Sequence, residues 1–175
     1  VRFAEEALEL LPKIEARWRV RVLALLGSHL ALGDEPIRGH ALARESVALA
    51  RELGDPETFI RAVMSLRYSL TDFDRDEVFP LVIEAEAIAE TEGFTALQIT
   101  LCTALSTASM WRGATSESDR WLARAGELTD TPTPNMATLV SALALLRGGL
   151  DDAARATELT RELYPPELWM HYVDR

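Results

Sequence analysis

One short run of residues returns at intervals along this chain of 175 residues. The run RELGDP at residues 51–56 recurs as GELTDTP at 126–132 and as RELYPP at 161–166. The leucines of these runs lie 75 and 35 residues apart, and ETEG at residues 90–93 fills the missing middle unit. A period of this length is typical of stacked helix pairs, because one pair cannot bury its apolar face alone. The repeat therefore predicts tandem helical hairpins that share a continuous core.

Helical periodicity extends along almost the whole chain. Leu, Ala, Val and Ile recur at spacings of three and four residues, and strand signals are absent. The predicted helices cover residues 3–11, 13–32, 36–53, 56–71, 77–92, 94–112, 116–129, 134–147, 150–163 and 166–174. We therefore expect an all-α fold, an α-α superhelix of antiparallel hairpins that forms one repeat domain over residues 1–175.

The expected helix ends have local chemical causes. Asp55 and Thr133 each precede a proline, so each offers a side-chain acceptor before the first helical position. Ser116 with Asp119 is similar to a capping box that uses a shorter acid than usual. Left-handed C-caps are expected at glycines that follow apolar-periodic runs, namely Gly54, Gly93, Gly113 and Gly148-Gly149.

Residues 148–153, GGLDDA, resemble the turn and second-helix start of a tetratricopeptide repeat. Ala43, Val47 and Ala50 follow the small–large–small spacing of that second helix, and Pro56 closes it. The usual Trp and Gly of the first helix are missing, and the first two hairpins have longer turns. The resemblance implies a degenerate, tetratricopeptide-like solenoid in which the first helix of each hairpin lines the concave surface.

Residues 41–56, ALARESVALARELGDP, look like the helical arrays of large bacterial signal-transduction ATPases. These multidomain regulators often carry a C-terminal LuxR-type helix-turn-helix. The resemblance implies a non-catalytic recognition and coupling domain of a bacterial transcriptional regulator. Such a domain binds a partner protein or a small-molecule effector and transmits the event to ATPase and DNA-binding modules.

The sequence contains neither a phosphate loop of the form G-x-x-x-x-G-K-[ST] nor a helix-turn-helix with a basic recognition helix. The predicted array also begins and ends with half-hairpins, and Trp169, Met170 and Tyr172 cluster on the last one. We therefore expect an excerpt of a longer protein, with those modules outside it, or a homodimer through exposed terminal helices. The alternative is a free-standing tetratricopeptide-like scaffold that binds peptide segments of partner proteins.

The net charge of −10 argues against direct contact with nucleic acid, which requires an excess of Lys and Arg. The basic run at residues 17–21, RWRVR, is the one local exception, and a solvated helix side is the favoured interpretation. No apolar run reaches the roughly 18 residues that span a bilayer. Cys102 is the single cysteine, so disulfides are excluded. These features predict a cytoplasmic protein without membrane contact.

No catalytic constellation is visible in the sequence. His29, His40 and His171 are not spaced as metal-ligand pairs, and no G-x-S-x-G elbow occurs. We interpret His29 as a core or hairpin-contact residue and Cys102 as a small buried hydrophobe. The prediction is a protein that is not an enzyme and that uses no cofactor and no metal.

Carrying the tetratricopeptide correspondence through the hairpin turns predicts a ligand or partner groove. Its residues are Arg61, Ser65, Tyr68, Thr100, Thr103, Thr107 and Met110. The threonines lie three and four residues apart, so they form one polar stripe on a helix. The alternative is close helix packing, with each hydroxyl bonded to its own helix. Trp18, Trp111 and Trp121 are interpreted as packing between hairpins.

Overall fold

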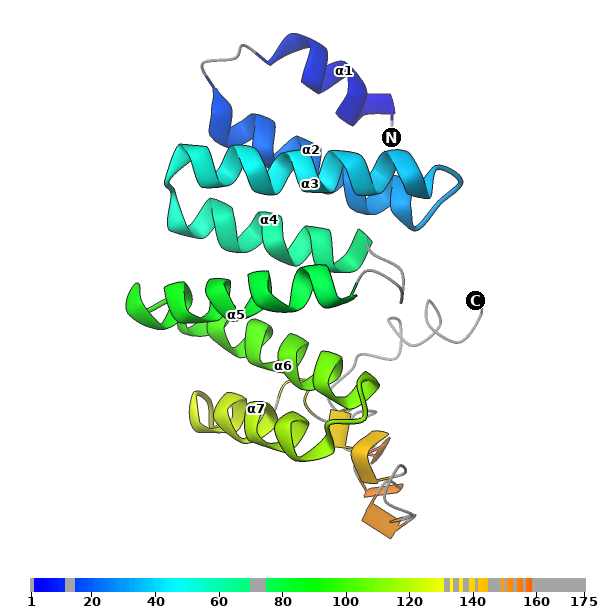
Figure 1. Ribbon diagram of the computed structural model, residues 1–175, viewed down its shortest axis with the longest axis vertical. Coiled ribbons are helices and arrows are strands. Elements are labelled where there is room, and N and C mark those ends of the chain that lie inside the picture. The colour runs from blue at the N-terminus through cyan, green and yellow to red at the C-terminus, as the bar shows by residue number, and fades with distance from the viewer. Residues whose placement is uncertain are drawn as a thin grey trace. The chain divides into compact units, whose positions relative to one another are not determined.

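The computed structural model describes residues 2–11, 15–69 and 75–130, together with positions 133, 136, 139–140, 142–144, 149, 151–152, 154–155 and 157–158. These residues form helices and turns and include no strand, so the all-α prediction is confirmed for them (Figure 1). The helices are α1 (Arg2–Leu10), α2 (Ala16–Ala31), α3 (Pro36–Leu53), α4 (Pro56–Ser69), α5 (Arg75–Thr91), α6 (Thr95–Trp111) and α7 (Thr115–Glu127).

The predicted bounds of these seven helices agree with the structure to within three residues. The expected helices at 134–147 and 150–163 are described only at single positions, most of them helical. The expected helix at 166–174, with Trp169, Met170 and Tyr172, lies outside the described residues. The prediction of a single repeat domain over residues 1–175 stays a prediction.

Three predicted C-caps are confirmed. Gly54, Gly93 and Gly113 have φ angles of 67°, 72° and 76°, the left-handed region in which a Cβ is strained. Gly148 lies outside the described residues, and the Gly149 N–H donates to the Ala144 carbonyl at 2.8 Å.

The predicted N-caps have mixed outcomes. The Thr58 N–H donates to Asp55 at 3.0 Å, and the Met136 N–H donates to the Thr133 hydroxyl at 3.3 Å. Both predicted acceptors therefore cap. The predicted capping box at Ser116 is wrong, because α7 begins earlier and its N-cap, Ala114, has no side-chain acceptor.

The chain divides into two compact units, residues 1–101 and 102–175, and the division falls within α6. In the first unit α2, α3, α4 and α5 lie beside one another in chain order (Figure 1). Helix α2 contacts both α3 and α4, α3 contacts α4, and α4 contacts α5. The helices thus pack against their neighbours around a shared apolar core. Its most buried residues on α2, α3 and α4 include Val20, Leu23, Leu26, Leu30, Ala43, Ala50, Ile60, Val63 and Leu66.

Helices α2 and α3 touch through their backbones at two glycines. A Cβ on Gly27 would lie 2.8 Å from the Ala43 backbone nitrogen and 3.0 Å from the Gly39 carbonyl oxygen. A Cβ on Gly39 would lie 2.6 Å from the Gly27 carbonyl oxygen and 2.7 Å from the Ala31 Cα. Backbone atoms cannot yield as a flexible side chain does, so this contact requires glycine at both positions.

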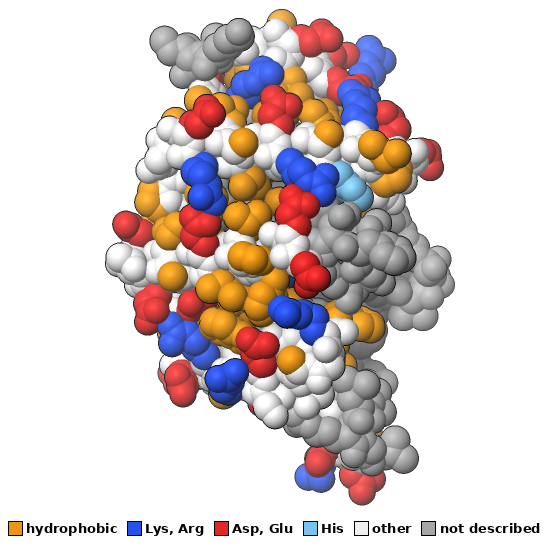
Figure 2. Space-filling view, viewed as in Figure 1, with side chains coloured by type: hydrophobic (Ala, Val, Ile, Leu, Met, Phe, Trp, Pro, Cys, Tyr) orange, Lys and Arg blue, Asp and Glu red, His pale blue; other side chains and the backbone are white. Residues whose placement is uncertain are grey.

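Ion pairs join alternate helices of the first unit at a constant sequence spacing of 33 residues. Figure 2 shows basic and acidic side chains next to one another over α3 and α5. The side chains in these pairs are 36–55% exposed, so each pair contributes little to the stability of the fold. The pairs are Glu5–Arg38 at 2.6 Å, Arg44–Glu77 at 2.7 Å and Arg51–Glu84 at 2.7 Å.

In the second unit, two buried serines join α6 to α7. The Ser106 hydroxyl donates to the Ser118 carbonyl at 2.9 Å, and the Ser118 hydroxyl donates to the Ser106 carbonyl at 2.8 Å. The small side chains allow the helices to approach, and the reciprocal bonds satisfy both hydroxyls. Cys102 is fully buried, as predicted for a small hydrophobe.

The glycine contact leads to a stability prediction. Gly39→Ala is expected to lower the free energy of unfolding by about 2 kcal/mol or more. The forced separation of α2 and α3 outweighs the gain of about 1 kcal/mol in helix propensity. Chemical denaturation followed by circular dichroism measures the change.

Gly126→Ala is the matched control, because Gly126 lies on α7 and, among the described residues, the atom nearest to an added Cβ is the Met136 Cε at 3.8 Å. This variant is expected to be as stable as the unmodified chain, or more stable by about 0.5–1 kcal/mol. Equal stability of Gly39→Ala and the unmodified chain would contradict the close backbone contact.

Candidate functional site

The predicted groove residues on α4 include one exposed cation and one packing hydroxyl. Arg61 is exposed and forms an ion pair with Glu57, one helical turn earlier, at 2.8 Å. The Ser65 hydroxyl donates to the Ala24 carbonyl of α2 at 2.5 Å and lies 3.0 Å from the Ser28 hydroxyl. Tyr68 belongs to α4, and its side chain lies outside the described residues. Ser65 therefore joins α4 to α2.

The predicted groove residues on α6 are largely satisfied by their own helix. The Thr100 hydroxyl donates to the Ala96 carbonyl at 3.0 Å, and the Thr107 hydroxyl donates to the Thr103 carbonyl at 2.8 Å. Thr103 is only 4% exposed, and Met110 is half-buried. These bonds match the alternative in which the threonines serve helix packing.

The predicted set spans both compact units. Arg61, Ser65 and Thr100 belong to the first unit, whereas Thr103, Thr107 and Met110 belong to the second. The groove that would combine them stays a prediction.

Three interpretations of large side chains need correction. His29 is exposed rather than buried, and its Nδ1 lies 2.9 Å from the Leu25 carbonyl oxygen. Trp18 and Trp111, interpreted as packing residues, are 55% and 63% exposed. Periodicity placed these residues on apolar helices but did not say which side of each helix would be covered.

The sequence-based prediction missed an exposed face of α2. Trp18, Leu25 and Leu32 recur at intervals of seven residues, so they share one side of the helix and the turn that follows it. Leu25 and Leu32 are 54% and 76% exposed. Val22 and His29 lie on the same side, at helical spacing from Leu25. We call these five residues the α2 stripe.

The signal for this stripe was present in the sequence. The buried side of α2 carries Val20, Leu23, Leu26 and Leu30, so the helix is apolar on two sides. One apolar stripe is what a helix on a protein surface needs, and a second indicates a second contact.

Helix α2 is also basic in an acidic protein. It contains Arg17, Arg19 and Arg21, and no Asp or Glu occurs from residue 16 to residue 33. The Arg21 guanidinium lies 5.1 Å from the centre of the Trp18 ring, a cation–π contact. Arg19 donates to the Leu8 carbonyl of α1 at 3.4 Å. The α2 stripe is thus an apolar surface with a positive charge at its Trp18 end.

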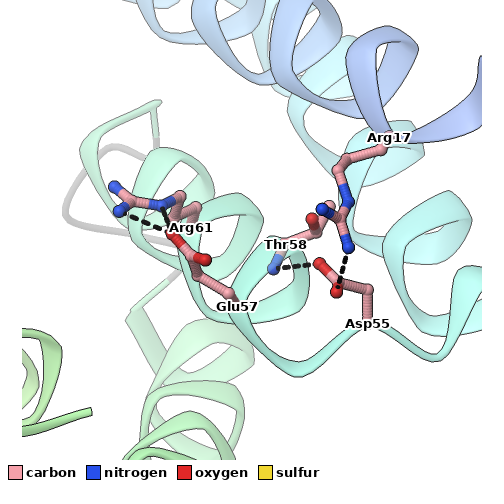
Figure 3. A network of polar contacts seen from close by, with 5 residues as sticks. All are labelled: Arg17, Asp55, Glu57, Thr58 and Arg61. Carbon is pink, nitrogen blue, oxygen red and sulfur yellow. Dashed lines mark hydrogen bonds and ion pairs between the residues drawn. The ribbon is translucent and has the colours of Figure 1, made fainter.

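Arg17 anchors the start of α2 to the start of α4 (Figure 3). Its guanidinium forms an ion pair with Asp55 at 2.5 Å. Thr58 and Arg17 hold the pKa of Asp55 below its usual value. Thr58 contributes through its backbone N–H, which donates to the Asp55 carboxylate at 3.0 Å. The pKa shift means that the ionised Asp55 carboxylate stabilises the folded state.

The described part of the chain shows no cluster of three or more His, Cys, Asp or Glu side chains that could hold a metal ion. Within that part, no helix combines the length and the apolar character that crossing a bilayer requires. Comparison of the chain with protein-family models, curated proteins and solved structures gives no match.

The Asp55 contacts lead to a pH-dependent prediction. Asp55→Ala is expected to lower the free energy of unfolding at pH 7 by about 1 kcal/mol, because it removes a helix cap. The folded-state pKa is lowered, so the stabilisation is complete above the unfolded-state value of about 3.9 and disappears as the pH falls through the folded-state value.

Urea unfolding of the unmodified chain and of Asp55→Ala at several pH values measures the difference in their free energies of unfolding. This difference is expected to become smaller in acid. Asp34→Ala is the control, since Asp34 is an exposed turn residue that caps no helix. A stability difference for Asp55→Ala that stays constant below pH 3 would exclude an ionised cap.

Proposed function

We propose that this chain is a tetratricopeptide-like superhelical array that works as a recognition and coupling domain of a bacterial transcriptional regulator. In this role it performs no catalysis. It binds a partner protein or effector and passes the binding event to ATPase and DNA-binding modules encoded outside these 175 residues. The resemblance of residues 41–56 to the arrays of such regulators supports the regulatory role.

The repeated contact between alternate helices is the observation that carries the array. Each of the ion pairs that link α1 to α3 and α3 to α5 spans 33 residues. Helix α2 meanwhile contacts α4 as well as its own hairpin partner α3. In stacked hairpins each helix contacts its partner in the same hairpin and the equivalent helix of the next hairpin. In this arrangement α2 and α4 are first helices, and α3 and α5 are second helices.

In that arrangement the first helices form the recognition surface. The contact of Ser65 with Ser28 brings the sides of α4 and α2 together. Arg61 of α4 and the α2 stripe then lie on the surface that meets a partner. In repeat proteins one side of each helix is used in stacking against its neighbours. Binding residues are therefore exposed on the other sides and on the loops.

The experiment uses the full-length gene in its bacterial host. Arg61→Ala combined with Tyr68→Ala is expected to reproduce the transcript changes caused by deleting the gene, because the predicted recognition surface loses its cation and its aromatic ring. RNA sequencing measures the transcripts, and immunoblotting confirms equal protein levels.

The matched control is Arg2→Ala, which also removes one exposed Arg–Glu pair between helical residues i and i+4, the Arg2–Glu6 pair at 2.8 Å. It is expected to leave transcription unchanged. A deletion that alters no transcripts would reject the regulatory role and favour the free-standing peptide-binding scaffold. The free-standing scaffold is also favoured if the flanking sequence encodes neither a phosphate loop nor a helix-turn-helix.

A further inference from the structure

The α2 stripe is an apolar surface of helical length. Trp18, Leu25 and Leu32 are spread over 14 residues, or about 21 Å along a helix axis. Their side chains are 55%, 54% and 76% exposed. A continuous row of this kind differs from isolated surface hydrophobics, which need no explanation.

The long helix α3 exposes mainly charged side chains over its middle and its C-terminal half. On α3 the exposed residues after the first turn include Arg44, Glu45, Arg51 and Glu52. The large apolar side chains that α3 exposes lie at its two ends: Ile37 is 86% exposed and Leu53 is 39% exposed. The α2 stripe thus differs from the charged outer side of α3, while the short helix α1 exposes two large apolar side chains of its own, Phe3 at 85% and Leu10 at 82%.

Charge indicates what kind of partner the stripe accepts. Arg21 stacks on Trp18, and among the described residues it forms no ion pair with a carboxylate. His29 adds an imidazole ring, a polar group, farther along the stripe. The acidic residues at the start of α4, Asp55 and Glu57, are already paired with Arg17 and Arg61. A partner with carboxylates on either side of an apolar row would complement these groups.

The chain itself provides an example of this recognition. Helix α1 is an acidic amphipathic helix, with the sequence RFAEEALEL, and it packs against α2. Its Glu5 pairs with Arg38 at 2.6 Å, and its Leu8 carbonyl accepts from Arg19. An acidic helix therefore lies against basic groups of α2 and α3 in the folded chain.

We propose that the α2 stripe binds an acidic amphipathic α-helix of a partner protein. Apolar side chains at positions i, i+3 or i+4, and i+7 of that helix contact Trp18, Leu25 and Leu32, and its carboxylates face Arg21 and His29. This proposal rests on the recognition role proposed above and specifies the chemical character of the partner. Its test uses the 175-residue chain alone, so it can fail while the transcription experiment succeeds.

The experiment measures fluorescence anisotropy of three labelled synthetic helices of about 16 residues, long enough to cover the stripe. One carries a Leu row with Glu on both sides, one replaces Glu with Lys, and one keeps Glu and replaces Leu with Ser. The acidic Leu helix is expected to bind about tenfold or more tightly than either of the others, because only it matches both the apolar row and the charge.

Two substitutions at exposed residues test whether the helix binds at the α2 stripe. Leu25→Glu is expected to weaken binding of the acidic Leu helix about tenfold or more, since it places a carboxylate in the centre of the apolar row. Ile37→Glu introduces the same charge at an apolar residue of α3 that is more exposed than Leu25, 86% against 54%, and is expected to leave the affinity unchanged. Circular dichroism confirms that both variants fold.

Several outcomes would overturn the proposal. They are equal binding of the Lys helix, binding that Leu25→Glu does not weaken, and no binding of any of the three helices. Sedimentation that shows a dimer of the unmodified chain and a monomer of Leu25→Glu would assign the stripe to a second copy of this chain instead.

Discussion

The backbone contact between Gly27 and Gly39 is the constraint on which the first unit depends. It brings α2 and α3 closer than side chains would allow, and apolar residues near the contact, Leu26, Leu30 and Ala43 among them, are buried. Helices α1, α3 and α4 all contact α2, yet the side chains of Trp18, Leu25 and Leu32 stay 55%, 54% and 76% exposed.

Polar groups in the first unit hold helices in register more than they add stability. The ion pairs between α1, α3 and α5 are exposed and individually weak, but their common spacing requires the same offset between successive odd-numbered helices. The Asp55 cap has a related role, because one carboxylate starts α4 and also binds Arg17 of α2. In each case a local sequence signal coincides with a contact between helices, so local and long-range preferences agree.

Sequence reasoning predicted the elements better than their surroundings. Helix bounds and the left-handed caps at Gly54, Gly93 and Gly113 follow from periodicity and backbone sterics, which are local. The exposure of His29 and Trp18 does not, because α2 is apolar on two sides and periodicity cannot say which side a neighbour covers. Thr100 and Thr107 show a related limit: spacing placed them on one side of a helix, and the structure shows their hydroxyls bonded within it.

The contacts of α2 also bear on how binding at its stripe would reach the rest of the first unit. Since α2 and α3 touch through backbone atoms, a shift of α2 cannot be absorbed by side-chain rotation and moves α3 with it. The links from α3 to α5, Arg44–Glu77 and Arg51–Glu84, are exposed pairs that can exchange with water at little cost. The α2–α3 hairpin is therefore connected to α5 in two ways, by these weak polar pairs and by α4, which packs against α2, α3 and α5.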